Sequence, residues 1–269
     1  MTGRLGILVV AGGMLASCAG RDRRSTVAST ASTTFARQVV LEGRSLTVHL
    51  QRGDAAHAHA LIVYATGDGG WRGKDRDVYR QMVSWGYAVA GFSAPEYLAH
   101  LSGDAGTTTP ARVGLDLAQV IDVTRDALLM PHSAPATLVG VSRGADLMVV
   151  AAGQPQLQPE LAGVVAMGLT REEEYVRRRR RPGVALELYA YLPRLGDLPL
   201  SVIQSTRDRY LPAADARALF GPDTPVRTLH PVAARNHSFA GARPRLYALL
   251  RDSLTWVGQH ASSSSGPRP

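Results

Sequence analysis

The sequence lacks several features that would define other classes of protein. It has a single cysteine, Cys18, so the folded part can contain no internal disulfide, even in an oxidising compartment. Its first uncharged run, residues 5–16, is shorter than the ~20 apolar residues that a transmembrane helix requires. The H-x-E-x-x-H spacing and other paired metal-ligand spacings are absent, so we expect neither a metal nor another cofactor.

Lysine is also scarce, and the positive charge of the chain comes almost entirely from arginine. The 30 basic and 22 acidic residues give a net charge of +8. The arginines are scattered, without a basic helix or interleaved aromatic residues, so we expect no nucleic-acid partner. A positive surface is instead compatible with anionic membranes. The hydrophobic content of 45% is enough for one core, and we expect a monomer with one folded domain.

The N-terminus has the pattern of a bacterial export signal. Arg4 is followed by the uncharged run, and Leu15-Ala16-Ser17-Cys18 then resembles a lipobox, in which the cysteine thiol receives a lipid. Cys18 would become the mature N-terminus on the periplasmic side of a membrane. Ala19, where some lipoproteins have Asp, slightly favours the outer membrane. The alternatives are an ordinary signal peptide that contains a cysteine and a buried N-terminal helix.

Composition divides the rest of the chain. A stretch rich in Ser, Thr, Ala and Arg follows the cysteine without apolar periodicity, and the chain ends in a serine run. We therefore predict a signal peptide at 1–17, a flexible tether at 18–35, a folded domain at 36–260 and a disordered tail at 261–269.

The folded part alternates short apolar runs with helical stretches. A hairpin is predicted over 39–50, and a last strand-like segment over 226–232. Buried-type strands are predicted at 61–65, 87–92, 137–139, 161–167 and 200–203. Helices are predicted at 77–85, 112–129, 145–152, 213–220 and 243–257. This order predicts an α/β fold, a mostly parallel doubly wound sheet with an antiparallel edge and helices on both faces.

A G-x-S-x-G motif joins the strand at 137–139 to the next helix. Ser142 stands between Gly140 and Gly144, as in the nucleophile elbow of an α/β-hydrolase, where flanking side chains would clash. Its position at the carboxyl end of a central strand is where open α/β sheets place their ligands. An ordinary tight turn is the alternative interpretation.

A serine nucleophile needs a base, and the base needs an orienting acid, in the chain order Ser, acid, His. Asp208 follows the strand at 200–203, whereas its rivals Asp197 and Asp215 lie before that strand and inside a helix. His237 lies in the loop before the last helix, and its competitor His230 lies within a strand-like run. The remaining candidates precede the serine: His57, His59 and His100. The predicted triad is therefore Ser142, His237 and Asp208.

The tetrahedral intermediate of ester cleavage needs about two backbone donors for its oxyanion. One is expected from the N–H of Arg143, directly after the nucleophile. The second is expected from the N–H of Asp68, because three glycines at 67–70 let that loop curl toward the substrate.

Two segments carry a resemblance to a known family. The loop Thr66-Gly67-Asp68-Gly69-Gly70-Trp71 and the elbow at 140–146 resemble the VirJ/AcvB family of bacterial virulence-associated proteins. The resemblance implies a periplasmic α/β-hydrolase that cleaves aminoacyl esters of phosphatidylglycerol, chiefly lysyl, with ties to type IV secretion components. The chain departs from the family at Val141 and Arg143 in the elbow, and it has a single histidine before Phe239.

Such a substrate presents an ammonium, an ester and a phosphodiester. We expect Asp68 or Asp146 to receive the ammonium, although Asp146 could instead brace the elbow, and we expect Trp71 and Arg143 to contact substrate. Arg72, Arg143 or the arginine run 177–181 could meet phosphate or the membrane. For that run, a solvated segment paired with the acids at 172–174 is favoured.

Two other functions stay open at the level of the sequence. One is a generic carboxylesterase or thioesterase for small acyl substrates. The other is a non-catalytic lipoprotein that binds type IV secretion components.

Overall fold

The computed structural model describes residues 34–57, 60–101, 109–174 and 185–263. They belong to one compact unit, Ser32–Pro269. The predicted signal peptide, Cys18, most of the tether and the arginine run 177–181 lie outside the described residues, so the predictions for them stay predictions. Within the described ranges, no helix has both the length and the apolar character to cross a membrane.

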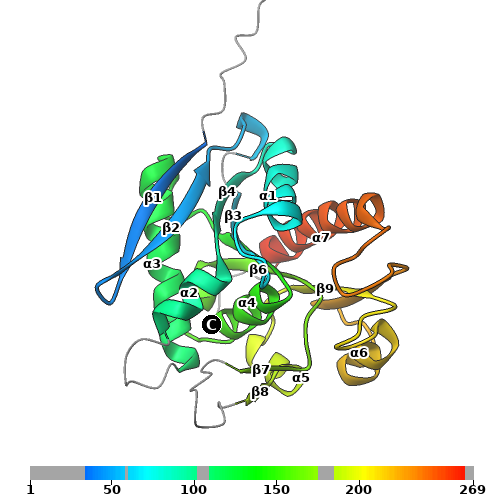
Figure 1. The fold of residues 1–269 in the computed structure, drawn as a ribbon. Helices are drawn as coiled ribbons and strands as arrows, with labels where there is room; N and C mark the ends of the chain where they lie inside the picture. Colours follow the sequence, from blue (N-terminus) through cyan, green and yellow to red (C-terminus); the bar gives the residue numbers. More distant parts are fainter. Residues whose placement is uncertain (1–33, 58–59, 102–108, 175–184, 264–269) are drawn as a thin grey trace, which may run out of the picture. The chain divides into compact units, whose positions relative to one another are not determined.

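An eight-stranded sheet forms the centre of the unit, in the order β1-β2-β4-β3-β5-β6-β9-β10 (Figure 1). β1 and β2 form the antiparallel hairpin at one edge, β2 joins β4 antiparallel, and the other pairs are parallel. The strands are β1 (Phe35–Leu41), β2 (Arg44–Gln51), β3 (Leu61–Ala65), β4 (Ala88–Phe92), β5 (Ala136–Val141), β6 (Leu161–Met167), β9 (Leu200–Ser205) and β10 (Arg227–Val232). The predicted fold class is confirmed.

Helices cover both faces of this sheet, which explains why its central strands are apolar along their whole length. Neighbouring residues of one strand enter opposite layers: Leu138 packs with α3 and α4, and Val139 with α1 and α7 (Figure 1). The helices that cover the two faces are α1 (Gly73–Ser84), α2 (Ala94–Leu101), α3 (Pro110–Leu128), α4 (Arg143–Ala152), α6 (Ala213–Phe220) and α7 (Arg243–Ser263).

Some elements differ from the sequence prediction. α2 was not predicted, although Ser93 Oγ accepts a hydrogen bond from the Glu96 N–H in the manner of a helix cap. A small second sheet, β7 (Glu172–Glu174) with β8 (Ala185–Glu187), and the short α5 (Leu188–Tyr191) were also missed. α7 continues to Ser263, so the helix enters the segment that was predicted to be a disordered tail.

Candidate active site

The turn between β5 and α4 holds Ser142 in an uncommon backbone conformation. Its φ is 52° and its ψ is −126°, a combination that costs about 1–3 kcal/mol for a residue with a side chain. A Cβ at Gly140 would lie 2.2 Å from the Gly144 carbonyl oxygen, and one at Gly144 would lie 2.3 Å from the Ala65 carbonyl oxygen. Only glycine fits at either position, so the packing of β3 against α4 fixes the elbow.

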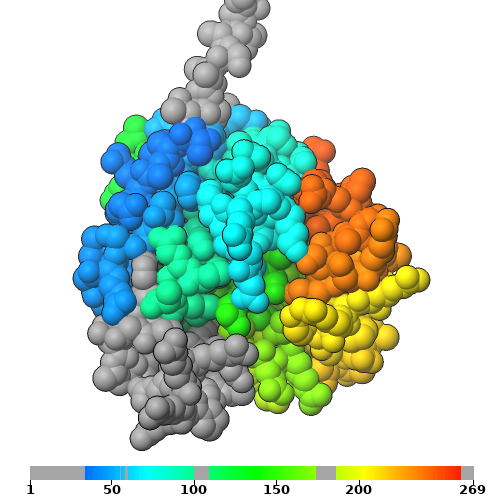
Figure 2. All heavy atoms as spheres, in the orientation of Figure 1, coloured from blue at the N-terminus to red at the C-terminus, as the bar shows by residue number. Residues whose placement is uncertain are grey.

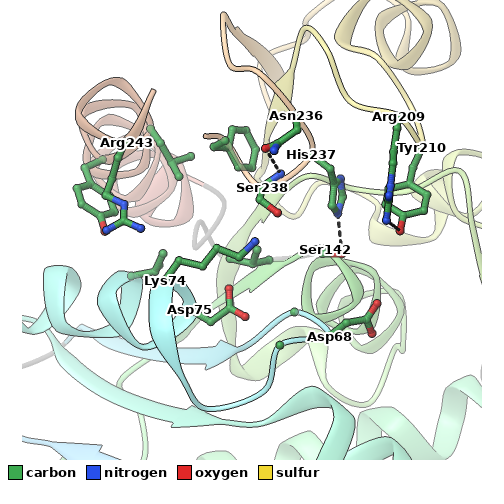
Figure 3. Close-up of a pocket in the computed structure, with 17 residues that line it drawn as sticks. Asp68, Lys74, Asp75, Ser142, Arg209, Tyr210, Asn236, His237, Ser238 and Arg243 are labelled. Atoms are coloured by element: carbon green, nitrogen blue, oxygen red, sulfur yellow. Dashed lines mark hydrogen bonds between the residues drawn. The ribbon is translucent and has the colours of Figure 1, made fainter. Parts of the chain in front are cut away.

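The structure brings the three predicted triad residues together. His237 Nε2 lies 2.7 Å from Ser142 Oγ (Figure 3). On the other side of the ring, His237 Nδ1 lies 2.5 Å from Asp208 Oδ2. With Nδ1–H donating to the carboxylate, Nε2 is left free to accept the serine proton. The three residues follow β5, β9 and β10, whose carboxyl ends lie at the same edge of the sheet.

Asp208 is held by further donors, which orient the imidazole through it. The residue is 2% exposed, and Oδ1 accepts a hydrogen bond of 2.8 Å from the Tyr210 N–H. Gln204 Nε2 donates to the other oxygen at 3.2 Å. The rival acids Asp197 and Asp215 are exposed, and neither enters this network.

The two expected oxyanion donors lie beside the nucleophile. Arg143 is the first residue of α4, so its N–H has no acceptor within the helix. The glycine loop approaches from β3: a Cβ at Gly67 would lie 3.2 Å from the Val141 carbonyl oxygen and 3.3 Å from Ser142 Cβ. Within the described backbone, the Asp68 N–H has no hydrogen-bond acceptor. Both amides are therefore placed where an oxyanion formed at Ser142 could accept from them.

This arrangement agrees with the family resemblance. Residues 59–178 match the family model of the bacterial virulence protein VirJ. The matched range contains the glycine loop and the elbow, and it confirms the resemblance over those residues. No curated protein matches the chain.

Solved structures of hydrolases share the fold at low sequence identity. The esterase Pf2001 of Pyrococcus furiosus is 14% identical, with a TM-score of 0.60 over 83% of this chain and 90% of that one. Est1E of Butyrivibrio proteoclasticus is 10% identical, with a TM-score of 0.57 over 84% and 99%. A dienelactone hydrolase of Anabaena variabilis is 16% identical, with a TM-score of 0.57 over 83% and 97%. The chain has the α/β-hydrolase fold.

Ser142 lines two pockets. The main pocket, of about 360 Å³, has apolar walls and four charged side chains besides Asp68: Lys74, Asp75, Arg209 and Arg243. The side pocket, of about 480 Å³, is largely acidic and is lined by Asp68, Ser142, Arg143, Asp146, Thr170, Glu172, Glu173 and Tyr210. In Figure 2, green atoms of the elbow region show between the cyan atoms that lead into α1 and the yellow and orange atoms of the later loops. Among the described residues, no group of acids, histidines and cysteines could hold a metal.

Arg143 is paired with acids of its own chain. Its guanidinium lies 3.2 Å from Asp68 Oδ1, and its Nε lies 3.2 Å from Glu173 Oε1. Glu173 is only 4% exposed, so this acid is not solvated, whereas the predicted pairing of the arginine run 177–181 with residues 172–174 lies outside the described residues. The charges of Asp68 and Arg143 largely compensate each other, which weakens both as the primary contacts of a charged substrate.

Asp146 serves as a brace. It is fully buried, and it accepts hydrogen bonds from the Thr170 N–H at 3.0 Å and from Thr170 Oγ1 at 2.8 Å. Burial, and then the neighbouring Glu173 carboxyl, raise the pKa of Asp146 well above its ordinary value. Of the two roles that the sequence left open, the contacts favour the structural one.

Trp71 lies away from the reaction centre, which corrects its expected role as a substrate contact. Its ring stacks on His49, with centroids 4.0 Å apart, and meets Tyr79 edge-on at 4.9 Å. It lines neither of the two pockets. Trp71 packs the end of the glycine loop against the sheet instead.

The sequence interpretation missed four charged residues of the main pocket: Lys74, Asp75, Arg209 and Arg243. Lys74, the one lysine of the chain, was a signal that could have been noticed. The helix was predicted to begin at 77, so Asp75 was left in the loop, whereas α1 begins at Gly73 and places Asp75 in its first turn. No pattern distinguished Arg209 and Arg243 from the other arginines.

Proposed function

We propose that the chain is a serine carboxylic-ester hydrolase of the periplasm that removes lysyl or alanyl groups from phosphatidylglycerol. The main observation in support of a hydrolase activity is the chain of hydrogen bonds from Ser142 through His237 to Asp208. The substrate class rests on what the resemblance to the VirJ/AcvB family implies, and residues 59–178 match the VirJ model.

The cycle follows from the geometry. His237 Nε2 takes the proton of Ser142 Oγ as the oxygen attacks the ester carbonyl, and the oxyanion accepts from the N–H groups of Asp68 and Arg143. The imidazolium then protonates the departing glycerol oxygen, and the aminoacyl group stays on Ser142. A water molecule gives a proton to the same nitrogen and attacks the acyl-enzyme, which releases the amino acid and restores the serine hydroxyl.

The main pocket has charges suited to such a substrate. Lys74 Nζ has no hydrogen-bond or ion-pair partner among the described residues, and its side chain reaches over the pocket (Figure 3). Arg243 lies on α7 at the other wall, 3.1 Å from Asp77. These exposed cations could bind the phosphodiester, while the apolar wall accepts the glycerol and the start of the acyl chains.

Product analysis tests the substrate class. We expect purified protein to release free lysine or alanine from vesicles that contain the aminoacylated phosphatidylglycerol. If the protein hydrolyses only a short-chain aryl ester, it is a generic esterase or thioesterase. The apolar wall of the pocket would also accept such a small ester.

Active-site labelling tests the chemistry. We expect a fluorophosphonate to label the protein, Ser142→Ala to abolish labelling, and Ser133→Ala, a change at an exposed loop serine, to retain it. If the native protein is not labelled, the result favours the alternative function, a non-catalytic lipoprotein that binds secretion components.

We also propose that a lipid on Cys18 holds the domain at the membrane, with the outer membrane slightly favoured by Ala19. The lipobox pattern supports this proposal. Mass analysis of the mature N-terminus should find the lipid in the native protein, and Cys18→Ser should move the protein to the soluble periplasmic fraction.

A further inference from the structure

One buried acid in the main pocket has no role in the cycle described above. Asp75 is 2% exposed, lies in the first turn of α1, and lines the pocket together with Ser142. Its carboxyl points into the pocket, whereas the side chain of Asp68 turns to the opposite side of the glycine loop (Figure 3). Among the described residues, no cationic side chain forms an ion pair with Asp75.

The glycine loop leaves this carboxylate open to the nucleophile. A Cβ at Gly69 would lie 3.0 Å from Asp75 Oδ2. A Cβ at Gly67 would lie 3.7 Å from the same oxygen and 3.3 Å from Ser142 Cβ. The distance from Asp75 Oδ2 to Ser142 Cβ is therefore at most the sum of the last two distances. Because Gly67 and Gly69 have no side chains, neither residue places one between these two atoms.

The position is unfavourable for a carboxylate unless a cation joins it. Burial raises the pKa of Asp75, and only Lys74 and the Gly67 N–H oppose that effect. Lys74, the adjacent residue on the helix, supplies the largest of the opposing effects, but its ammonium is exposed and forms no ion pair with Asp75. A negative charge here also repels the oxyanion that forms at Ser142 when a neutral acyl group is attacked.

The other acids near Ser142 are already engaged. Asp68 and Glu173 pair with Arg143, and Asp146 is fully buried against Thr170. Among the described residues, Asp75 is the buried acid that faces the main pocket without an ion-pair partner.

We propose that the Asp75 carboxylate is the specificity-determining group that binds the α-ammonium of the acyl moiety. The inference rests on the proposed ester hydrolysis and adds the residue that selects α-amino acids. An α-ammonium is carried by the carbon next to the reacting carbonyl, so an acyl group on Ser142 brings it to the space that Asp75 faces. Lysyl and alanyl esters share this ammonium, so Asp75 selects both over an unsubstituted acyl group.

The test compares two esters that differ only by the ammonium: the 4-nitrophenyl esters of alanine and of propionic acid. In Asp75→Asn, kcat/KM for the alanine ester should fall about tenfold to a hundredfold, the effect of losing one charge-assisted hydrogen bond. The value for the propionic ester should stay the same or rise, because a repulsive charge has been removed. Asp215→Asn is the matched control, since Asp215 is also the third residue of its helix and is exposed.

An equal loss with both esters would overturn the proposal and make Asp75 a brace of the glycine loop through Gly67. Unchanged rates with both esters would overturn it as well. The rate of labelling by a neutral fluorophosphonate shows that the triad of the variant is folded, and it should match or exceed the native rate. If Asp75→Asn does not fold, Asp75→Ser takes its place in the same comparison.

Failure of the proposed function gives a different result from failure of the role assigned to Asp75. Native protein that does not label and cleaves neither ester refutes ester hydrolysis itself. Native protein that labels and cleaves the propionic ester in preference to the alanine ester retains the hydrolase and refutes the selectivity assigned to Asp75.

Discussion

The residues of the site work through constraints that their neighbours impose. Ser142 has a positive φ because β3 and α4 approach so closely that glycine is required on both flanks. His237 has a defined tautomer because Asp208 accepts from Nδ1, and Asp208 is itself oriented by the Tyr210 N–H and Gln204. The reactivity expected of the hydroxyl is thus set by groups that never touch a substrate.

Asp208→Asn is expected to reduce kcat about 10⁴-fold while the protein remains folded. The amide nitrogen would donate to Nδ1, so Nε2 would carry the proton and could no longer accept one from Ser142. Steady-state kinetics on a soluble ester, with a thermal melt as the folding control, measures this. A kcat within tenfold of the native value would contradict the assigned acid.

Gly144→Ala should destabilise the protein by about 3 kcal/mol, because the new Cβ would lie 2.3 Å from a backbone oxygen that cannot move. Gly258→Ala is the matched control. Its Cβ would meet nothing within 4 Å inside α7, so it should stabilise the protein by about 0.5–1 kcal/mol. Urea unfolding of the two variants measures both effects, and similar free energies of unfolding would argue against the packing at the elbow.

At the scale of elements, the buried strands were the most predictable part of the fold. β3 and β6 have the predicted bounds because both of their faces are covered, so a continuous run without charged residues marks each strand. The small sheet was missed for the opposite reason. The acids of β7 look solvated in sequence, but Glu173 is buried, and Arg143, distant in the chain, supplies a counter-charge to it.

The link between α4 and the loop after β6 should respond to pH through Asp146. Because burial raises the folded pKa of this group above 3.8, the folded state keeps a proton that the unfolded state releases, and stability falls as the pH rises above about 4. Asp146→Asn can keep both hydrogen bonds to Thr170 and has no such titration. In thermal melts from pH 4 to pH 8, the melting temperature of the variant should rise relative to that of the native protein as the pH increases. Melting temperatures that depend on pH in the same way in both proteins would contradict the raised pKa of Asp146.

At the scale of the molecule, every residue assigned to the site lies in the described part of one compact unit. The triad could be predicted because the fold prescribes its order along the chain and its places after strands. The roles of Asp75, Trp71 and Asp146 could not be predicted, because each depends on which way a side chain turns once the helices have docked. The periodicity of apolar residues predicts which face of a helix or strand is buried. It says little about the side chains near the ends of these elements, where the three residues lie.

A chain that begins at Ser32 should therefore fold and retain the native kcat/KM on soluble esters within about twofold. It lacks Cys18, so its activity on vesicles should fall relative to that of the lipidated protein. Assays of the two forms on a soluble ester and on vesicles measure the difference. Loss of soluble activity would show that the first 31 residues contribute to the site.

The order of the triad in the chain also has a consequence for biosynthesis. During translation the serine emerges first and the acid follows, whereas the histidine arrives only with the last edge strand and the terminal helix. A nascent or prematurely terminated polypeptide therefore carries the hydroxyl without the group that activates it. Catalytic competence is acquired only once β10 and the loop after it have left the ribosome.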